Sequence, residues 1–432
     1  MSSPHNLPKY ELKTAVDFVI VGGGAAGGVV AKELASVGFQ VLILEQGPYI
    51  RPGEFVHDEL RFKDPYNPPH FGREVLTNDH ALQPNTFRHQ EREKAVRQPA
   101  VVYGSCVGGG TVHFTANYWR FHEIDFIERS RWGPISDTGF SDWPITYPEL
   151  EPYYTKAEWE LGISGQAGAS PFDPPRSKPY PLPPMPVKSS GVLLERGARK
   201  LGWHPFPAPV AVLSRAYRGR SACQHCGFCE WFGCEWGAKS SSLASVIPMA
   251  EATGRCEIRP NCYVRRISID KRGRVDGVNY FDAQRGEKFQ KARAVVVCAN
   301  GAESPRLLLL SESNLFPHGL ANSSGLVGKY LMFDQGAVAQ GIFEHQLNDY
   351  KSIQVTRVVH DFYDSDATRG FFGGGGIDGR FDFYPIGFAL SSLPPGTPGW
   401  GSGFKQALQQ NFTRTMTVIC HTTTLPDRKS VV

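Results

Sequence analysis

Glycine and acidic residues near the N-terminus have the types and spacing of a dinucleotide-binding site. Gly22, Gly24 and Gly27 form a Gly-x-Gly-x-x-Gly pattern with Ala26 inside it, and Glu45 follows further along. The first glycine permits a tight turn, the second lets the backbone approach a pyrophosphate, and the third allows close helix–strand packing. A carboxylate at Glu45 can accept from ribose hydroxyls and disfavours a 2′-phosphate, so FAD or NAD is favoured over NADP. The alternative is a glycine-rich turn without a ligand.

A cluster of four cysteines is the second group with the spacing of a chemical site. Cys223, Cys226, Cys229 and Cys234 lie close together, whereas the other five cysteines are scattered singly. Zinc sites usually need two separated ligand pairs, while thiolates packed into one loop suit an iron–sulfur cluster. We therefore expect an iron–sulfur cluster, with a zinc site or disulfides as the alternatives.

A second glycine-rich loop precedes an aromatic segment. Bare backbone in such a loop can approach a flat ring or a pyrophosphate, because no Cβ stands in the way. Asn117 and Arg120 could bond a ring edge or a substrate, whereas His113 is interpreted as a packed core histidine. A turn that serves only chain geometry is the alternative. The candidate backbone contacts are Gly104, Ser105, Gly108 and Gly109.

The elements that must position these residues follow from the apolar pattern. Short apolar runs at 18–21 and 41–44 predict buried parallel strands, and Val30, Leu34 and Val37 between them recur at helical spacing. Further strands are expected at 263–269 and 294–298, and the chain becomes strand-like and glycine-rich beyond residue 332. The pattern predicts an α/β Rossmann-like domain, followed by a strand-rich second part.

Composition excludes several classes of function. The chain has 432 residues, 20% of them charged, and a net charge of +4, which is too small to indicate a nucleic-acid partner. No run of eighteen apolar residues predicts a transmembrane segment, and the first sixteen residues lack the apolar core of a signal peptide. We expect either a cytoplasmic protein or one exported with a partner that carries the signal.

These motifs together resemble the glucose–methanol–choline (GMC) oxidoreductases, which are FAD enzymes. The two glycine loops and the segments 112–114, 118–120, 142–145 and 150–154 are similar to the branch of gluconate 2-dehydrogenase and fructose dehydrogenase large subunits. The resemblance extends from about residue 16 to about residue 426. It implies FAD as the cofactor, with Val264 near the adenine and Ala299 and Gly301 near the pyrophosphate. It also implies an α+β substrate domain built on an antiparallel sheet.

The resemblance also implies a three-iron, four-sulfur cluster rather than a four-iron one in the cysteine loop. Such a cluster takes three thiolates; Cys229 and Cys234 are the firmest ligands, and Cys223 is preferred over Cys226 as the third. In the family a histidine near the C-terminus removes the hydroxyl proton. We find no counterpart after Pro426, and His421 lies in a strand pattern, so no catalytic residue is assigned to this chain and the chain as given is expected to be inactive.

Domain boundaries follow from these assignments. Residues 427–432 match a translated sequencing adapter, so we expect a non-native tail on a truncated chain. The proline-rich stretch 171–186 is expected to be an extended linker. The predicted parts are an FAD-binding domain at 15–135 with a lid or insertion at 48–98, a cap region at 136–214, a second FAD-binding part at 215–335, an incomplete substrate domain at 336–426, and the tail at 427–432.

The resemblance implies FAD-dependent oxidation of a sugar or sugar-acid alcohol, such as gluconate. Electrons would pass through the cluster to a cytochrome c subunit or quinone, and a small signal-bearing subunit would carry the chain to the periplasmic side of the inner membrane. Alternatives are a glucoside 3-dehydrogenase or polyol dehydrogenase of the same build, and a non-catalytic flavin-binding electron-transfer or assembly subunit.

Overall fold

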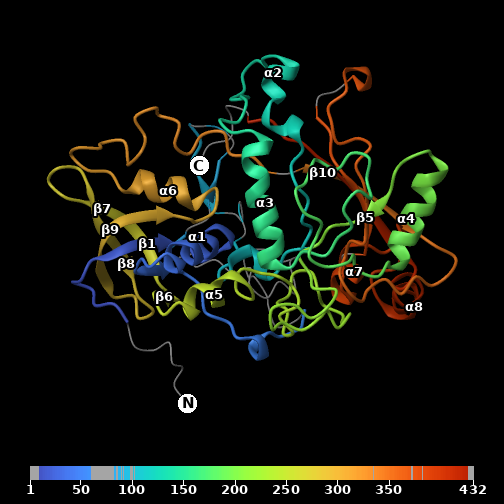
Figure 1. The fold of residues 1–432 in the computed structure, drawn as a ribbon. Coiled ribbons are helices and arrows are strands. Elements are labelled where there is room, and N and C mark those ends of the chain that lie inside the picture. The colour runs from blue at the N-terminus through green and yellow to red at the C-terminus, as the bar shows by residue number, and fades with distance from the viewer. Residues whose placement is uncertain are drawn as a thin grey trace.

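The structure of the protein is a computed structural model. It describes residues 9–59, 82–83, 86–88, 90, 92–97, 101, 103–333, 335–370, 373–381 and 383–426. Most of the predicted insertion at 48–98 and the whole predicted tail at 427–432 therefore lie outside the described residues. Two large sheets organise the chain, one on each side of a central helix (Figure 1).

The first sheet is parallel at one side and antiparallel at the other. Its order is β6-β2-β1-β9-β8-β7. The strands β6, β2, β1 and β9 are parallel to one another, and the β9-β8-β7 meander is antiparallel. The long strand β9 pairs with β8 through its first half and with β1 through its second half. The strands are β1 (Val16–Val21), β2 (Val41–Leu44), β6 (Cys256–Arg259), β7 (Tyr263–Ile269), β8 (Val275–Phe281) and β9 (Glu287–Val297).

Alternating side chains of the central strands pack into two separate cores. Val19 and Leu42 point to one face, where Leu307 of helix α6 (Glu303–Leu310) covers them. Ile20 and Ile43 point to the other face, beneath α1 (Ala25–Ser36) and α5 (Val246–Ala252). Successive strand side chains face opposite sides of a sheet, so a continuous apolar run needs helices on both faces. This arrangement confirms the predicted α/β unit.

The second sheet is antiparallel and confirms the predicted second architecture. Its order is β10-β13-β12-β11-β5, so a strand from the middle of the chain closes one edge. Helix α4 (Ser189–Lys200) packs against this sheet. The strands are β5 (Phe206–Pro207), β10 (Gln335–Ile342), β11 (Arg357–Val359), β12 (Ile377–Arg380) and β13 (Thr415–Thr422), and α7 (Pro385–Ser391) and α8 (Gly401–Asn411) lie nearby (Figure 1).

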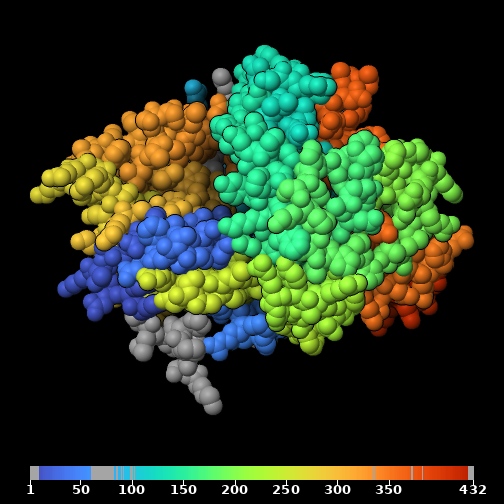
Figure 2. All heavy atoms as spheres, viewed as in Figure 1, coloured from blue at the N-terminus to red at the C-terminus, as the bar shows by residue number. Residues whose placement is uncertain are grey.

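Helix α3 (Tyr147–Leu161) lies between the two sheets (Figure 1). Thr146 and Glu149 form a capping box at its start, and Gly162 ends it in the left-handed conformation. In Figure 2 its segment, in teal, forms the surface between the parallel-sheet half and the antiparallel-sheet half. The remaining elements are α2 (Glu128–Trp132) and the hairpin of β3 (Thr86–Phe87) and β4 (Val96–Arg97).

The proline-rich stretch differs from its predicted role. Residues 171–186 contain no helix or strand, as expected of an extended segment. Leu182 and Met185 are nevertheless buried, and Met185 belongs to a core cluster with Phe206. The stretch is therefore packed against the second sheet, because its few large apolar side chains are buried there. Among the described helices, none is long and apolar enough to cross a bilayer.

Candidate functional site

A cavity of about 650 Å³ lies where three parallel strands end. Gly22 follows β1, Glu45 follows β2 and Cys298 follows β9, and all three line the cavity. In open α/β sheets ligands bind outside the carboxyl ends of the strands. The cavity also meets the second glycine loop at Gly104 and Gly109. The tertiary fold therefore brings the two glycine motifs to one place.

Gly22 and Gly109 have no room for side chains. A Cβ on Gly22, which has φ +98°, would lie 2.7 Å from the carbonyl oxygen of Cys298. A Cβ on Gly109 would lie 2.9 Å from the Cα of Gly24, so the two glycine loops touch through bare backbone. Gly108 joins them further, since its amide donates to the Gly23 carbonyl at 2.8 Å. The backbone is left exposed to a ligand, as a pyrophosphate requires.

Glu45 is buried and held by backbone amides. Its carboxyl oxygens accept from the amides of Gly23 at 2.8 Å and Gly47 at 2.9 Å. Burial raises the pKa of Glu45 to about 7, although the amide hydrogen bonds favour the carboxylate. The side chain is thus fixed at the cavity wall, with lone pairs left to accept from ribose hydroxyls.

Most, but not all, of the residues predicted from the sequence line this cavity. Gly27 does not, because its role is packing: a Cβ there would lie 1.9 Å from the Gly22 carbonyl oxygen. Ser105, Gly108 and Asn117 also lie outside the wall, and their predicted contacts stay predictions. Asn117 instead forms a β-bridge with Val210. The predicted residues that line the cavity are Gly22, Gly24, Ala26, Glu45, Gly104, Gly109, Val264, Ala299 and Gly301.

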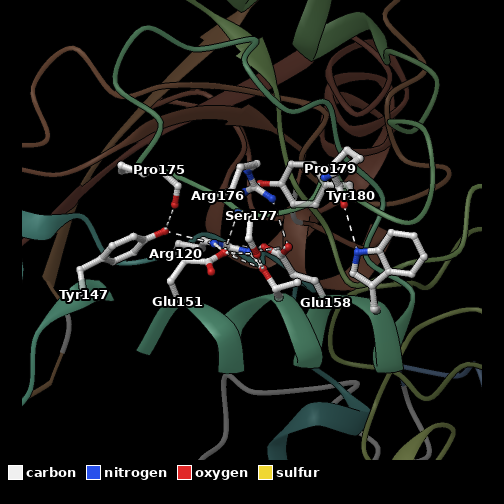
Figure 3. A network of polar contacts seen from close by, with 11 residues as sticks. Arg120, Tyr147, Glu151, Glu158, Pro175, Arg176, Ser177, Pro179 and Tyr180 are labelled. Carbon is white, nitrogen blue, oxygen red and sulfur yellow. Dashed lines mark hydrogen bonds and ion pairs between the residues drawn. The ribbon is translucent and has the colours of Figure 1, made fainter. Parts of the chain in front are cut away.

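Arg120 does not reach the cavity, contrary to the interpretation of it as a ring-edge or substrate partner. Its Nε and Nη2 donate to Glu158 at 2.7 and 2.8 Å, and Nη1 donates to Tyr147 and Glu151 (Figure 3). Its side chain is 1% exposed and that of Glu158 is fully buried. Because the guanidinium is committed to helix α3, its role is structural. The sequence could not show this, because the partners lie 27 to 38 residues away.

The start of α6 and the residues just before it also line the cavity. Asn300 caps the start of α6, since its Oδ1 accepts from the amides of Ala302 and Glu303. Glu303 then accepts from Tyr103 at 3.0 Å and from Arg306 at 2.8 Å. The cavity therefore faces the N-terminus of a capped helix, which favours an anionic group. The Asn300-x-x-Glu303 spacing was the signal that could have located it.

The cysteine loop reaches the same cavity. Trp231, between Cys229 and Cys234, lines the wall and stacks on His113 with ring centroids 5.7 Å apart. His113 also lines the cavity, so it is a wall residue and not only a core residue. The loop that carries the thiols therefore forms part of the boundary of the cavity.

The four clustered cysteines supply the thiol ligands that an iron–sulfur cluster needs, but their side chains do not converge on one point in the described residues. All four are free thiols and only partly exposed, and the amide of His225 donates to the Cys223 sulfur at 3.4 Å. Burial raises the pKa of Cys223 to about 12 and of Cys226 to about 11. Within the described residues no three Cys, His, Asp or Glu side chains converge as a metal site. The predicted ligand set stays a prediction.

Backbone strain accompanies this loop. His225, Phe228 and Trp231 all have positive φ, at 52°, 49° and 65°. Non-glycine residues rarely adopt this conformation, and such positions tend to gather at functional sites. Lys239 holds the loop from within, donating to the carbonyl oxygens of Cys229 at 2.5 Å and Phe232 at 3.1 Å.

Comparison with known proteins gives a consistent result. The family model described as GMC oxidoreductase matches residues 16–332. The solved structure of Aspergillus oryzae formate oxidase superposes with a TM-score of 0.57 at 17% identity, covering 95% of this chain and 73% of that one.

Three curated relatives extend the comparison. A 2-methyl-1,2-propanediol dehydrogenase of Mycolicibacterium austroafricanum is 31% identical, over 92% of this chain and 69% of that protein. A gluconate 2-dehydrogenase flavoprotein of Pantoea cypripedii is 28% identical, over 95% and 71%. A fructose dehydrogenase large subunit of Gluconobacter japonicus is 32% identical, over 74% and 59%.

Proposed function

The chain belongs to the GMC oxidoreductase family, whose FAD-dependent members act on CH–OH donors, and we propose that its own substrate is a sugar, a sugar acid or a small polyol. The family relatives are dehydrogenases and oxidases, which supports an oxidoreductase. The motifs of the two glycine loops indicate the same family.

The observation that carries the proposal is the fit of the cavity to FAD. Gly22, Gly24 and Gly109 present bare backbone at the place where a pyrophosphate would lie, and a Cβ on Gly22 or Gly109 would collide with the neighbouring backbone. Glu45 would accept from the ribose hydroxyls, and the capped start of α6 would face the phosphates. Bound FAD supplies the acceptor for a hydride from the alcohol carbon.

The finer part of the proposal concerns the cysteine loop. We propose that three of Cys223, Cys226, Cys229 and Cys234 hold an iron–sulfur cluster, most simply a three-iron one. The supporting observations are four free thiols in one loop, the three strained residues among them, and the contact of Trp231 with the cavity. A bound cluster supplies one-electron transfer toward a cytochrome c or quinone.

Partners and location follow as a further part of the proposal. One relative is named as a large subunit, so we propose that this chain also works with a small signal-bearing subunit and a cytochrome c subunit, at the periplasmic side of the inner membrane. Purifying the tagged chain from its native host tests this. A co-purifying c-type haem is the expected result, and a chain that purifies alone and without haem would contradict it.

Absorption spectroscopy on anaerobically purified protein tests the cofactors. Flavin bands are expected, together with about three irons per flavin, the content of a three-iron cluster. Cys229→Ala should lose the iron and keep the flavin, whereas Cys256→Ala, at a buried thiol on β6 outside the loop, should keep both. Flavin without iron would remove the cluster from the proposal, and absence of flavin would remove the proposal itself.

A further inference from the structure

A cluster of aromatic and histidine side chains lies where the antiparallel sheet approaches the cavity. His421 of β13 pairs with Gly336 of β10, and Phe333, three residues before Gly336, lines the cavity. A chain advances at most about 3.6 Å per residue, so the Cα of Gly336 lies within about 11 Å of that of Phe333. A second route leads from the wall residue Trp231 to its neighbour Glu230, which forms an ion pair with Arg380 of β12.

His421 is held in one orientation by a buried carboxylate. Its Nε2 donates to Asp378 at 2.8 Å, and Arg380 donates to the same carboxylate through Nε at 2.7 Å and Nη2 at 2.5 Å. Because a carboxylate only accepts, Nε2 carries a proton, and in the neutral form of the ring Nδ1 is an acceptor. The His421 side chain is 36% exposed, whereas Asp378 is fully buried. The His421 ring is therefore oriented by Asp378 and partly accessible.

Two neighbouring side chains carry buried polar atoms that lack hydrogen bonds. Neither ring nitrogen of His360 has a partner in the described part of the chain, and the same holds for Trp119 Nε1. The Trp119 ring lies edge-on to both histidines, with centroids 5.2 Å from His360 and 5.3 Å from His421. Native structures usually pair buried donors and acceptors, because an unpaired one has lost its hydrogen bonds to water without replacement.

The surroundings of the cluster are negatively charged. Asp378 and Glu230 supply two carboxylates against the single guanidinium of Arg380. Burial and, to a smaller extent, the neighbouring histidines lower the pKa of His360 to about 3, so this ring adds no positive charge at neutral pH. A ligand carboxylate would meet repulsion here, whereas uncharged hydroxyl groups would not.

We propose that His421, His360 and Trp119 form a substrate subsite for an uncharged ligand with several hydroxyl groups, a neutral sugar or small polyol, in preference to a sugar acid. His421 Nδ1 accepts from one hydroxyl, and Trp119 Nε1 donates to another. The Trp119 ring packs against the C–H face of the ligand. The inference rests on the proposed function and narrows its substrate class.

Ligand titration of the flavin-loaded full chain, followed by saturation-transfer NMR, tests the subsite. D-sorbitol is the neutral probe and D-gluconate the anionic one. Sorbitol is expected to bind at least about tenfold more tightly than gluconate, which corresponds to about 1.4 kcal/mol. His421→Ala and His360→Phe should each weaken sorbitol binding at least about tenfold. His204→Ala is the matched control, since His204 forms an exposed ion pair with Asp361 outside the cluster and should bind sorbitol as wild type does.

The outcomes separate this inference from the proposed function. His360→Phe should fold, because it replaces unpaired nitrogens by carbon, so its loss of sorbitol binding cannot be assigned to unfolding if its flavin spectrum is intact. Tighter binding of gluconate, or unchanged sorbitol affinity in both cluster variants, would overturn the subsite while the flavin bands remain. A chain without flavin bands would overturn the proposed function instead.

Discussion

Burial shifts the pKa values of two side chains in opposite directions, one at each candidate site. Desolvation raises the pKa of Glu45 to about 7 and lowers the pKa of His360 to about 3. Both shifts favour the uncharged form, as expected when an ionisable group leaves water. The hydrogen bonds of the two side chains differ. Glu45 accepts from two backbone amides, whereas neither ring nitrogen of His360 has a hydrogen-bond partner among the described residues.

Glu45→Gln is expected to weaken FAD binding by about 1–3 kcal/mol, roughly 10- to 100-fold in Kd. The amide group of glutamine turns one acceptor into a donor, which then faces the amide of Gly23 or Gly47. Fluorescence titration of the apoprotein with FAD measures the change. Glu33→Gln, at a partly exposed ion pair on α1, is the control and should leave Kd unchanged. Equal affinity in both variants would contradict the role of Glu45.

His360→Phe is expected to reduce the acid sensitivity of the fold. The folded-state pKa is depressed, so between about pH 6.5 and 3 the unfolded chain binds a proton that the native chain does not. Stability contributed by this group is complete above about pH 6.5 and is lost as pH falls. Urea unfolding at pH 7 and pH 5 should show the wild type losing about 1–2 kcal/mol more than the variant. An equal loss in both would mean that His360 titrates normally.

Helix α1 shows at the scale of an element why two glycines in helices have opposite roles. Gly27 brings α1 against the turn after β1, where a Cβ would lie 1.9 Å from the Gly22 carbonyl oxygen. Gly197 in α4 has nothing within 4 Å of the position of its Cβ. The first glycine is required by packing, whereas the second only adds backbone freedom to the unfolded chain.

Gly27→Ala and Gly197→Ala should therefore change stability with opposite signs. Gly27→Ala forces α1 away from β1, and we expect a loss of at least about 3 kcal/mol with weaker FAD binding. Gly197→Ala removes unfolded-state entropy at an unobstructed helix position, and a gain of about 0.5–1 kcal/mol is expected. Urea unfolding of both proteins, followed by circular dichroism, gives the two values. An unchanged free energy of unfolding in Gly27→Ala would show that α1 can move away from β1 without loss of stability.

At the scale of the whole molecule, helix α3 lies between the two sheets and carries a buried ion-pair network. Glu158 is fully buried and accepts from Arg120 and from Arg176 of the proline-rich stretch (Figure 3). Arg120 follows Trp119, the aromatic residue of the cluster around His421. The ion-pair network thus joins helix, proline-rich stretch and proposed subsite in one buried unit.

Arg120→Met should destabilise the protein strongly. Removing the guanidinium leaves Glu158 buried with Arg176 as its remaining cationic partner, and breaking a buried pair costs about 3–5 kcal/mol. Arg274→Ala removes an exposed i,i+4 pair with Asp270 and should cost under about 0.5 kcal/mol. Urea unfolding of both variants provides the comparison. A loss below about 1 kcal/mol for Arg120→Met would mean that water or Arg176 replaces its bonds.

Much of the fold and part of the site could be predicted from local patterns. The βαβ unit depends on apolar periodicity and glycine spacing, which act over short separations. For the same reason the glycine motif and its acidic residue are enough to predict Gly22, Gly24 and Glu45 as nucleotide-binding residues, and all three line the cavity. A strand, its turn and the following helix are neighbours in both sequence and space.

Which distant residues meet depends on the tertiary structure. From the sequence Arg120 is interpreted as a partner of a ring edge or a substrate. In the structure the Arg120 side chain is buried beside Glu158 and donates its hydrogen bonds to α3 instead. Trp231 and His113 form one wall of the cavity although they lie far apart in the sequence, and His421 meets Asp378 across adjacent strands. Sequence periodicity specifies the buried face of each element, whereas the pairing of those faces is set by packing of the whole chain.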